Sequence, residues 1–313
     1  MSTLADRLET LAANLQTQID AKFAERSTNT PRKAQQAANA RLDGLHLERT
    51  QKALRALAER HRSGTVPDLL AKLTTKKAIE DLTRPETTRG SGYYDAPRET
   101  GKPANNSPAA LLLWSMIEDN GSDERRAAAD LQQKLDDVRF RRIPGYFATP
   151  TKTVDILINR VGLPEGETVK VLEPEAGSGN IADRIRTRFP KAELTLFEIA
   201  PALQEILKLK GYDLAGSDFL DAAPQAVCDF VVMNPPFERD ADIIHVLQAL
   251  KWLKPGGRLV SIMSAGVKFR QNKRAAAFRQ MVADSGGWFE DLPDDSFKES
   301  GTSVSTGLVV FEK

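Results

Sequence analysis

One motif in the second half of the chain has the residue types needed to hold a planar amino group. Asn234-Pro235-Pro236-Phe237 directly follows the apolar run 230–233. The side-chain oxygen of Asn234 and the main-chain carbonyl of Pro235 can each accept one N–H of an amine. A residue before proline is held extended, so the motif is stiff and costs little entropy to order. With Phe237 as an apolar face for a flat ring, the motif predicts catalysis by positioning, with no general base.

A glycine-rich turn upstream of this motif has the composition of a ligand-binding loop. Glu173 ends an apolar strand pattern, and Ala-Gly-Ser-Gly at 176–179 leads into a helical pattern that begins at Asn180. Glycines at such a turn let the backbone approach a ligand that side chains would exclude. The turn lacks the Gly-Lys-Ser/Thr of a phosphate-binding loop, and Asp183 takes the place near the third glycine of a G-x-G-x-x-G motif.

Acidic residues follow the next two strand patterns, where a nucleoside would need hydrogen-bond acceptors. Glu198 comes at the end of the pattern 193–197 and can accept both hydroxyls of a ribose. Asp218 can accept a hydrogen bond from an adenine amino group, and Phe219 can pack on the ring. The order of these residues after the glycine turn predicts a nucleoside site.

The elements that must position these residues alternate from about residue 168 onward. Short apolar strand patterns are followed by amphipathic helix patterns, which predicts an α/β fold with a doubly wound sheet and ligands at the carboxyl ends of its strands. The expected strands are 169–172, 193–197, 230–233, 258–263 and 303–311, and the expected helices are 180–188, 202–209, 241–253 and 274–284.

Taken in order, these motifs resemble the class I S-adenosylmethionine-dependent methyltransferases, and among them the amino-methyltransferases marked by (D/N/S)-P-P-(Y/F). The resemblance covers about residues 145–313. It implies a Rossmann-like fold, S-adenosylmethionine as cofactor and methyl transfer to an exocyclic amine. Gly-Tyr-Phe-Ala-Thr-Pro at 145–150 also resembles the Phe-x-Thr-Pro element of N6-adenine DNA methyltransferases.

The same resemblance implies roles for individual residues. The 145–150 segment and the glycine turn match family elements at the methionine end of the cofactor, Glu198 matches the ribose acceptor, and the remaining positions match adenine contacts. The implied cofactor-binding residues are Tyr146, Phe147, Thr149, Pro150, Glu173, Ala176, Gly177, Gly179, Asn180, Glu198, Ile199, Asp218 and Phe219. The implied catalytic residues are Asn234, Pro235, Pro236 and Phe237.

A basic run beyond the strand pattern 258–263 offers phosphate contacts beside the target base. Its residues are Lys268, Arg270, Lys273 and Arg274. Phe297 stands where relatives carry an aromatic residue that contacts the base. Structural alternatives stay open, because the run can be the solvated start of a helix and the phenylalanine an ordinary core residue.

The leading functional prediction is an N6-adenine methyltransferase acting on DNA. Because no target-recognition segment is expected after the last strand pattern, either the N-terminal helices read DNA or sequence selectivity is low, and low selectivity is favoured. The alternatives are an rRNA guanine-N2 methyltransferase, a release-factor glutamine methyltransferase and a non-catalytic cofactor-binding adaptor. The first two present a planar amine to the same motif. Phe237, where tyrosine is the other choice, and the 145–150 segment favour DNA.

The first part of the chain predicts a helical accessory module at 1–82. Apolar residues recur every three or four positions over 4–23, which is the spacing of one helix face, and further helical patterns cover about 42–63 and 67–82. From Arg26 to Arg62 there are nine basic and three acidic residues, which permits a polyanionic partner.

Residues 83–107 are rich in Pro, Gly and polar residues and predict a linker or a mobile loop. Tyr93 and Tyr94 within it are candidates to close over a ligand. Helical patterns resume over 109–118 and 123–138, and a methyltransferase domain is expected at 108–313, with its core from about 145.

Composition narrows the class of protein. The chain has 313 residues, 41% hydrophobic and 28% charged, which is a globular balance. One cysteine excludes an intrachain disulfide, and three scattered histidines leave little material for a metal site. No apolar run approaches the length of a membrane span. We therefore expect a cytoplasmic protein of a bacterium or phage, without metal or membrane partner and with its oligomeric state undecided.

Overall fold

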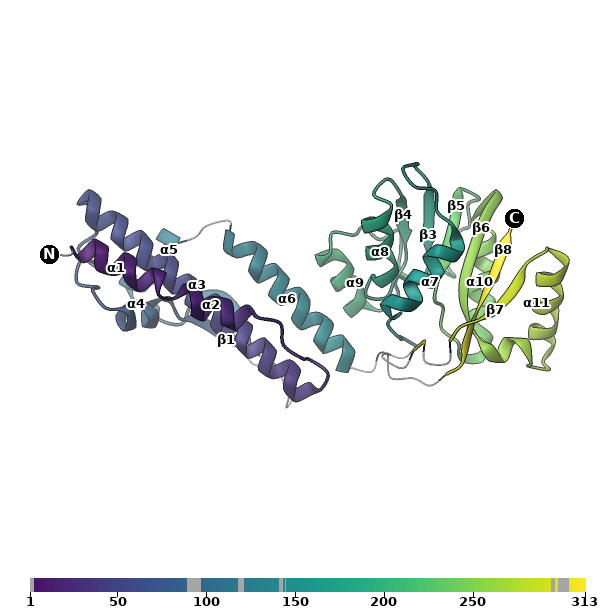
Figure 1. The fold of residues 1–313 in the computed structure, drawn as a ribbon, viewed down its shortest axis with the longest axis horizontal. Coiled ribbons are helices and arrows are strands. Elements are labelled where there is room, and N and C mark those ends of the chain that lie inside the picture. Colours follow the sequence, from purple (N-terminus) through teal and green to yellow (C-terminus); the bar gives the residue numbers. More distant parts are fainter. Residues whose placement is uncertain are drawn as a thin grey trace. The chain divides into compact units, whose positions relative to one another are not determined.

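The computed structural model describes residues 3–88, 97–117, 121–140, 143, 145–293, 296–297 and 304–313. It divides into two compact units, Met1–Phe140 and Arg141–Lys313, and each is described by itself (Figure 1). In the described part of the chain, no helix is both long and apolar enough to cross a membrane.

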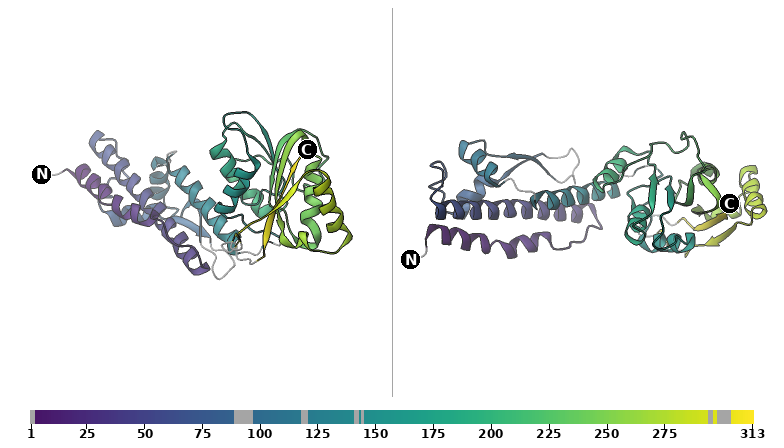
Figure 2. Two further views of the ribbon diagram at one scale, coloured as in Figure 1. Left: turned by 45° about the vertical axis from the view of Figure 1, so that its right-hand side comes forward. Right: turned by 90° about the horizontal axis from the view of Figure 1, so that it is seen from above.

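Helices packed around one long helix form the first unit. α1 (Leu4–Ala13) and α2 (Gln16–Phe23) run alongside α3 (Pro31–Ser63) and bury one apolar stripe against it (Figure 2). The single helix predicted over 4–23 is therefore two, separated by a turn. At Gly44 in α3, a Cβ atom would lie 2.9 Å from the ring of Phe23, so glycine lets α2 approach closely.

The predicted linker 83–107 contains paired strands. β1 (Pro85–Thr88) pairs antiparallel with β2 (Arg98–Pro103), and Glu99 accepts a hydrogen bond of 2.7 Å from Arg49 in α3. Because this ion pair is largely shielded from water, it holds the hairpin on α3 in a way that composition does not reveal. Tyr93 and Tyr94 lie outside the described residues.

The division between the units lies at residue 140, not at the boundary expected at 107. α4 (Lys76–Thr83) and α5 (Pro108–Ile117) pack in the first unit, where the Trp114 indole donates to the carbonyl of Leu82. α6 (Gly121–Phe140) is tied to α3 by an ion pair between Arg41 and Asp136. These tertiary contacts, rather than a local pattern, assign residues 108–140 to the helical unit.

In the second unit, a six-stranded sheet in the order β4-β3-β5-β6-β8-β7 confirms the predicted Rossmann-like α/β fold. Neighbours among β4, β3, β5 and β6 are parallel, whereas β8 is antiparallel to both β6 and β7. The chain order reverses between β3 and β5, which opens a crevice at their carboxyl ends. The strands are β3 (Lys170–Glu173), β4 (Glu193–Leu196), β5 (Cys228–Met233), β6 (Leu253–Ser264), β7 (Trp288–Asp291) and β8 (Thr306–Glu312).

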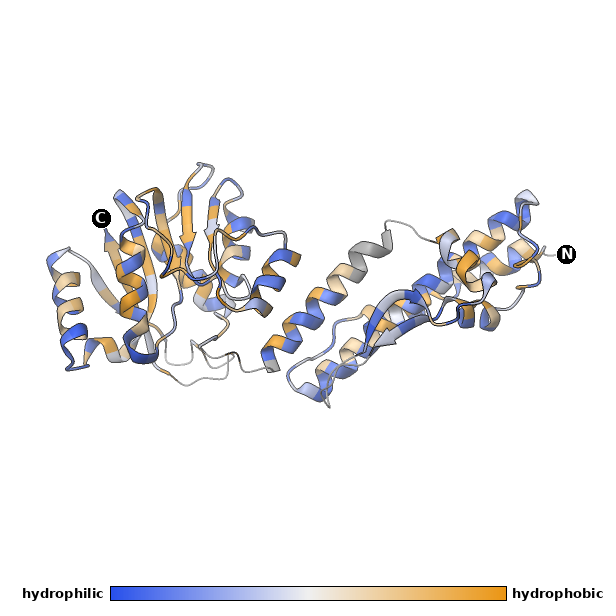
Figure 3. Cartoon of the chain, turned by 180° about the vertical axis from the view of Figure 1, so that it is seen from behind, coloured by the Kyte–Doolittle hydropathy of each residue, from blue (hydrophilic) through white to orange (hydrophobic). Residues whose placement is uncertain are grey.

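Helices cover both faces of the sheet (Figure 1), and the central strands of the sheet are largely hydrophobic (Figure 3). Alternate strand residues face opposite sides, so Val232 packs in one core cluster and Val231 in the other. The first cluster includes side chains of α7 and α8, and the second includes those of α10 and α11. The helices are α7 (Thr151–Val161), α8 (Asn180–Arg188), α9 (Pro201–Leu209), α10 (Ala241–Leu250) and α11 (Lys273–Asp284).

Most predicted elements of this unit agree with the structure within a few residues, and two differ. The helix predicted to 253 ends at Leu250, and β6 already begins at Leu253 and continues through Pro255. β7 was not predicted, because its sequence Trp-Phe-Glu-Asp is neither an apolar run nor an alternation of apolar and polar residues.

Candidate active site

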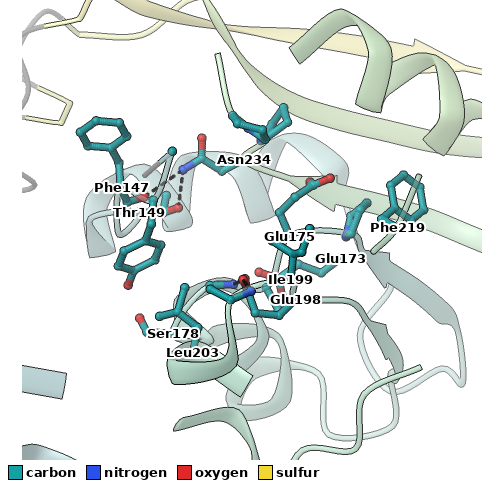
Figure 4. Close-up of a pocket in the computed structure, with 18 of the residues that line it drawn as sticks. Phe147, Thr149, Glu173, Glu175, Ser178, Glu198, Ile199, Leu203, Phe219 and Asn234 are labelled. Atoms are coloured by element: carbon teal, nitrogen blue, oxygen red, sulfur yellow. Dashed lines mark hydrogen bonds between the residues drawn. The ribbon is translucent and has the colours of Figure 1, made fainter. Parts of the chain in front are cut away.

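A cavity of about 150 Å³ opens at the carboxyl ends of β3, β4 and β5 (Figure 4). Its lining contains all four predicted catalytic residues and all the predicted cofactor-binding residues except Pro150 and Gly179. Pro150 is the N-cap residue of α7, and Gly179, with φ 87°, is the N-cap residue of α8. Both therefore shape the lining from just behind it.

Glycine is required at the turn after β3 because the backbone is left-handed and crowded there. Gly177 has a φ of 57°, and a Cβ atom on it would lie 2.9 Å from the Tyr146 ring. Its N–H donates to Glu198 Oε2 at 2.7 Å, while Ala200 N–H donates to Glu198 Oε1 at 2.8 Å. The carboxylate of Glu198 is thereby held at the junction of β4 and the turn.

Three carboxyl groups lie next to one another in the cavity, those of the buried Glu173 and Glu198 and of the partly exposed Glu175 (Figure 4). Burial raises the pKa of all three, and the neighbouring carboxylates raise that of Glu173 further, to well above its usual range. In the described part of the chain, Oε2 of Glu173 and Oε2 of Glu175 have no hydrogen-bond partner. Buried acceptors of this kind suit a cationic ligand.

The amide of Asn234 is oriented by the segment that precedes α7. Its Nδ2 donates to Thr149 Oγ1 at 3.0 Å and to the carbonyl of Phe147 at 3.4 Å (Figure 4). A carbonyl can only accept, so the amide nitrogen must face Phe147 and the amide oxygen is left for another donor. The 145–150 segment, expected at the methionine end of a cofactor, also positions the predicted catalytic residue.

Thr149 connects three elements of the site. Besides its bond to Asn234 after β5, its carbonyl accepts from Asn180 Nδ2 at 2.8 Å, at the first turn of α8. Only 6% of Thr149 is exposed. The position of the Asn234 amide is thus coupled to the start of α7 and to the glycine turn.

Ile199 is the most exposed of the large apolar residues that line the cavity in the described part of the chain. It is 65% exposed, whereas Phe219 is buried against Phe197 and Trp252, with ring centroids 5.5 and 6.0 Å away. Phe219 therefore contributes to the wall from within the core. Asp218 accepts the backbone N–H of Leu220 at 2.9 Å and lines the cavity.

The predicted substrate-binding residues do not line the cavity. Lys268 pairs with Asp291 at 2.5 Å, and Arg270 pairs with Asp240 and donates to Ser264 Oγ at 2.9 Å. Acidic residues distant in the sequence thus neutralise much of the run, which a count of local charges could not show.

The other members of this set differ in their surroundings. The Arg274 guanidinium lies 3.9 Å from Asp240, and Lys273 is exposed at the start of α11. Phe297 is 2% exposed in the core cluster beside α7. The structure therefore favours the core alternative for Phe297, because a side chain packed on all sides cannot stack on a base.

The loop after the Asn-Pro-Pro-Phe motif has strained backbone geometry. Arg239 and Asp240 have φ values of 53° and 62°, in the left-handed region that non-glycine residues rarely adopt. Asp240 accepts hydrogen bonds from Arg270 and, at 3.0 Å, from Asn272. The basic run therefore holds this loop in place.

Sequence reasoning missed the contact between Glu175 and His245. Glu175 Oε1 lies 2.5 Å from His245 Nδ1, and both residues line the cavity. The histidine lies on α10, 70 positions after the glutamate. The only sign of this contact in the sequence was a single histidine in the helix pattern that follows the Asn-Pro-Pro-Phe motif.

Comparisons with known proteins agree with this geometry. Residues 137–287 match the methyltransferase small domain family. Over 147 residues the chain is 31% identical to ribosomal RNA small subunit methyltransferase C of Pasteurella multocida (strain Pm70), covering 42% of this chain and 44% of that protein. The type I restriction-modification system methyltransferase subunit from Streptococcus thermophilus has a TM-score of 0.51 at 16% identity, covering 94% of this chain and 68% of that one. The second unit has the class I methyltransferase fold.

The cofactor of this methyltransferase domain is S-adenosylmethionine. The lining fits it, because the unpartnered oxygens of Glu173 and Glu175 suit its ammonium and sulfonium groups. The exposed face of Ile199 suits a flat purine. The match to the ribosomal RNA enzyme spans less than half of that protein, so the similarity concerns the domain.

Proposed function

We propose that this chain methylates an exocyclic amino group of a nucleic-acid base, with adenine N6 in DNA as the leading substrate. One observation carries the proposal. The Asn234 amide is held through its nitrogen by Thr149 and Phe147, in the lining of the cofactor cavity, with its oxygen left to accept. An acceptor fixed beside a methyl donor is what an amine of low nucleophilicity needs.

The mechanism depends on positioning. The lone pair of an exocyclic base amine is delocalised into the ring. When Asn234 Oδ1 and the carbonyl of Pro235 each accept one N–H, the nitrogen is drawn toward tetrahedral geometry and its lone pair is directed at the methyl group. Phe237 supplies the face for the base to stack on. The nitrogen then loses its extra proton to water, because no general base is involved.

The cofactor contacts follow from the same cavity. Bound S-adenosylmethionine supplies an electrophilic methyl group on a sulfonium. Glu173 would accept from the ammonium of its methionine moiety, Glu198 from the ribose hydroxyls and Asp218 from the adenine amino group. Ile199 would cover the adenine ring.

Guanine N2 in ribosomal RNA is the second candidate, and the identity with the ribosomal RNA enzyme of Pasteurella multocida favours it. Guanine N2 is also a planar amine and fits the same mechanism. Support for DNA comes from the Phe-x-Thr-Pro sequence of residues 147–150 and from Phe237. The restriction-modification subunit shares the fold.

The test uses tritium-labelled S-adenosylmethionine and the full chain, with unmethylated duplex DNA, small-subunit ribosomal RNA and release factor offered separately. Label recovered as N6-methyladenine supports the leading proposal, and its density per adenine measures selectivity. Label recovered in N2-methylguanine or in a glutamine amide would show that ribosomal RNA or release factor, and not DNA, is the substrate. No label in any acceptor, with the cofactor bound, would favour an adaptor. Asn234→Ala is the control that distinguishes methyl transfer at this site from the activity of a contaminating methyltransferase.

A further inference from the structure

The lining of the cofactor cavity is acidic. Among the described residues, its lining includes Glu173, Glu175, Glu198 and Asp218 and no lysine or arginine. His245 is the one lining side chain there that can carry a positive charge. Carboxylates in such a space repel each other, so a bound cation is favoured.

Glu175 has a distinct place among these carboxylates. One of its oxygens contacts His245 Nδ1 and the other has no partner in the described part of the chain. The side chains of Glu175 and His245 are 17% and 14% exposed. A neutral imidazole can donate from Nδ1 and leave the negative charge of the carboxylate in place. The histidine therefore orients Glu175 without cancelling its charge.

The other glutamates cannot distinguish the cofactor from its product. Both oxygens of Glu198 already accept backbone N–H groups, and its proposed partners are the ribose hydroxyls. Glu173 is proposed to bind the ammonium. Ribose and ammonium are present both in S-adenosylmethionine and in S-adenosylhomocysteine. The two molecules differ only at sulfur, which carries the methyl group as a cationic sulfonium before transfer and is a neutral thioether after it.

We propose that Glu175, oriented by His245, selects the sulfonium form of the cofactor over its neutral product. This inference rests on the proposed methyl transfer. In that step the N–C bond forms as the S–C bond breaks, and sulfur keeps the electron pair. The positive charge moves to the amine and leaves as a proton. Glu175 then loses its ionic partner, so S-adenosylhomocysteine is bound more weakly and product inhibition is reduced.

The test is to measure by calorimetry the Kd of S-adenosylmethionine, S-adenosylhomocysteine and sinefungin, whose amine is a cation near the position of the sulfonium. In Glu175→Gln, the affinity for the two cationic ligands should fall about tenfold, or about 1.4 kcal/mol, while that for S-adenosylhomocysteine changes by less than about twofold. Glu167→Gln, at an exposed glutamate of the same domain, is the matched control.

His245 variants test its positioning role. His245→Ala should lower the ratio of the Kd of S-adenosylhomocysteine to the Kd of S-adenosylmethionine. His245→Asn should largely restore this ratio, because the asparagine amide can donate from nearly the place of Nδ1. Circular dichroism confirms that each variant is folded. Equal loss of affinity for all three ligands in Glu175→Gln, or no loss, would overturn the inference.

Failure of the proposed function gives a different result. These affinities are measured without any methyl acceptor. If no acceptor becomes labelled while the wild-type chain discriminates and Glu175→Gln does not, the function is wrong and the charge selection stands. If labelling succeeds and the ratio is the same in both proteins, the function stands and the charge selection is wrong.

Discussion

Two groups of charged residues lie at the same edge of one sheet and differ in how their charges are compensated. After β3, Glu173 and Glu175 each have one buried carboxylate oxygen that has no partner among the described residues. After β6, which runs parallel to β5, Lys268 and Arg270 are paired with aspartates. The sequence predicted ligand contacts both for Glu173 and for the basic run, yet in the structure the carboxylates are the ones left for a ligand.

The physical reason is the cost of burying charge. A buried carboxylate without a partner destabilises the fold, so it persists where a ligand repays that cost. A fully exposed ion pair is nearly neutral in energy. The partly buried pair of Arg270 with Asp240 is already satisfied within the protein and holds a loop. Unpaired polar atoms therefore locate the binding site better than charge density does.

The largest effect is expected at Asn234, whose side-chain oxygen is proposed to accept a hydrogen bond from the target amine. Asn234→Ala should lower kcat by roughly 10²-fold, because an electrostatic contact made at the reacting group is lost. Cofactor affinity should change by less than about twofold. Single-turnover methylation and calorimetry measure the two values. Unchanged activity would refute the mechanism.

Glu173 tests the unpaired side of the comparison. Glu173→Gln should weaken S-adenosylmethionine binding on the order of thirtyfold, since a charge-assisted hydrogen bond contributes about 2 kcal/mol. Because burial raises the pKa of Glu173 above its usual 4.5, ionising it costs the folded state free energy. The stability of the ligand-free protein should therefore decline as the pH rises through that pKa, and the variant should decline less.

Thermal unfolding with and without cofactor, over a range of pH, checks this prediction. Affinity of the wild-type chain for S-adenosylmethionine should fall as the pH drops through the same pKa, because protonation removes the charge. A variant that binds the cofactor normally, or a Tm lower than that of the wild type at neutral pH, would show that Glu173 is compensated within the protein.

Arg270 tests the paired side. Arg270→Gln should lower the free energy of unfolding by about 1–2 kcal/mol, since Asp240 and the buried Asp242 lose their cation and the guanidinium is only partly exposed. Lys273→Gln, which removes an exposed charge nearby, should leave stability unchanged. Urea unfolding compares them. If Lys273→Gln alone weakens nucleic-acid binding and lowers its salt dependence by about one charge, that residue still contacts phosphate.

Thr149 tests whether pairing of the amide nitrogen matters. Thr149→Val should lower kcat about fivefold, as the loss of a hydrogen bond worth about 1 kcal/mol lets the Asn234 amide rotate. The KM for the cofactor should change little. Thr151→Ala, at an exposed position of the same segment, is the control. An effect on KM alone would instead place Thr149 at the cofactor.

Phe297 should give the smallest effect. Phe297→Leu should cost about 1 kcal/mol of stability, as is usual for a hydrophobic replacement in a packed core. The KM for the methyl acceptor should stay the same. A raised KM for the methyl acceptor without loss of stability would instead support the prediction that Phe297 contacts the target base.

Much of the methyltransferase domain was determined by the sequence alone, because its signals are local. Gly177 and Gly179 are needed where the backbone is left-handed, and that requirement is visible in the residue type. The motif at 234–237 is rigid through its own prolines. Alternation of strands and helices between 168 and 313 follows from periodicity, which depends only on neighbouring residues.

Tertiary structure decided which polar groups are paired. The contact of Glu175 with His245, the aspartates that neutralise Arg270 and the pairing of Arg49 with Glu99 all join residues that are far apart in the chain. Hydrogen bonds and ion pairs depend on distance in space, so no local pattern encodes them. For that reason the sequence determined where the catalytic motif lies, and only the folded chain showed which charges are left for a ligand.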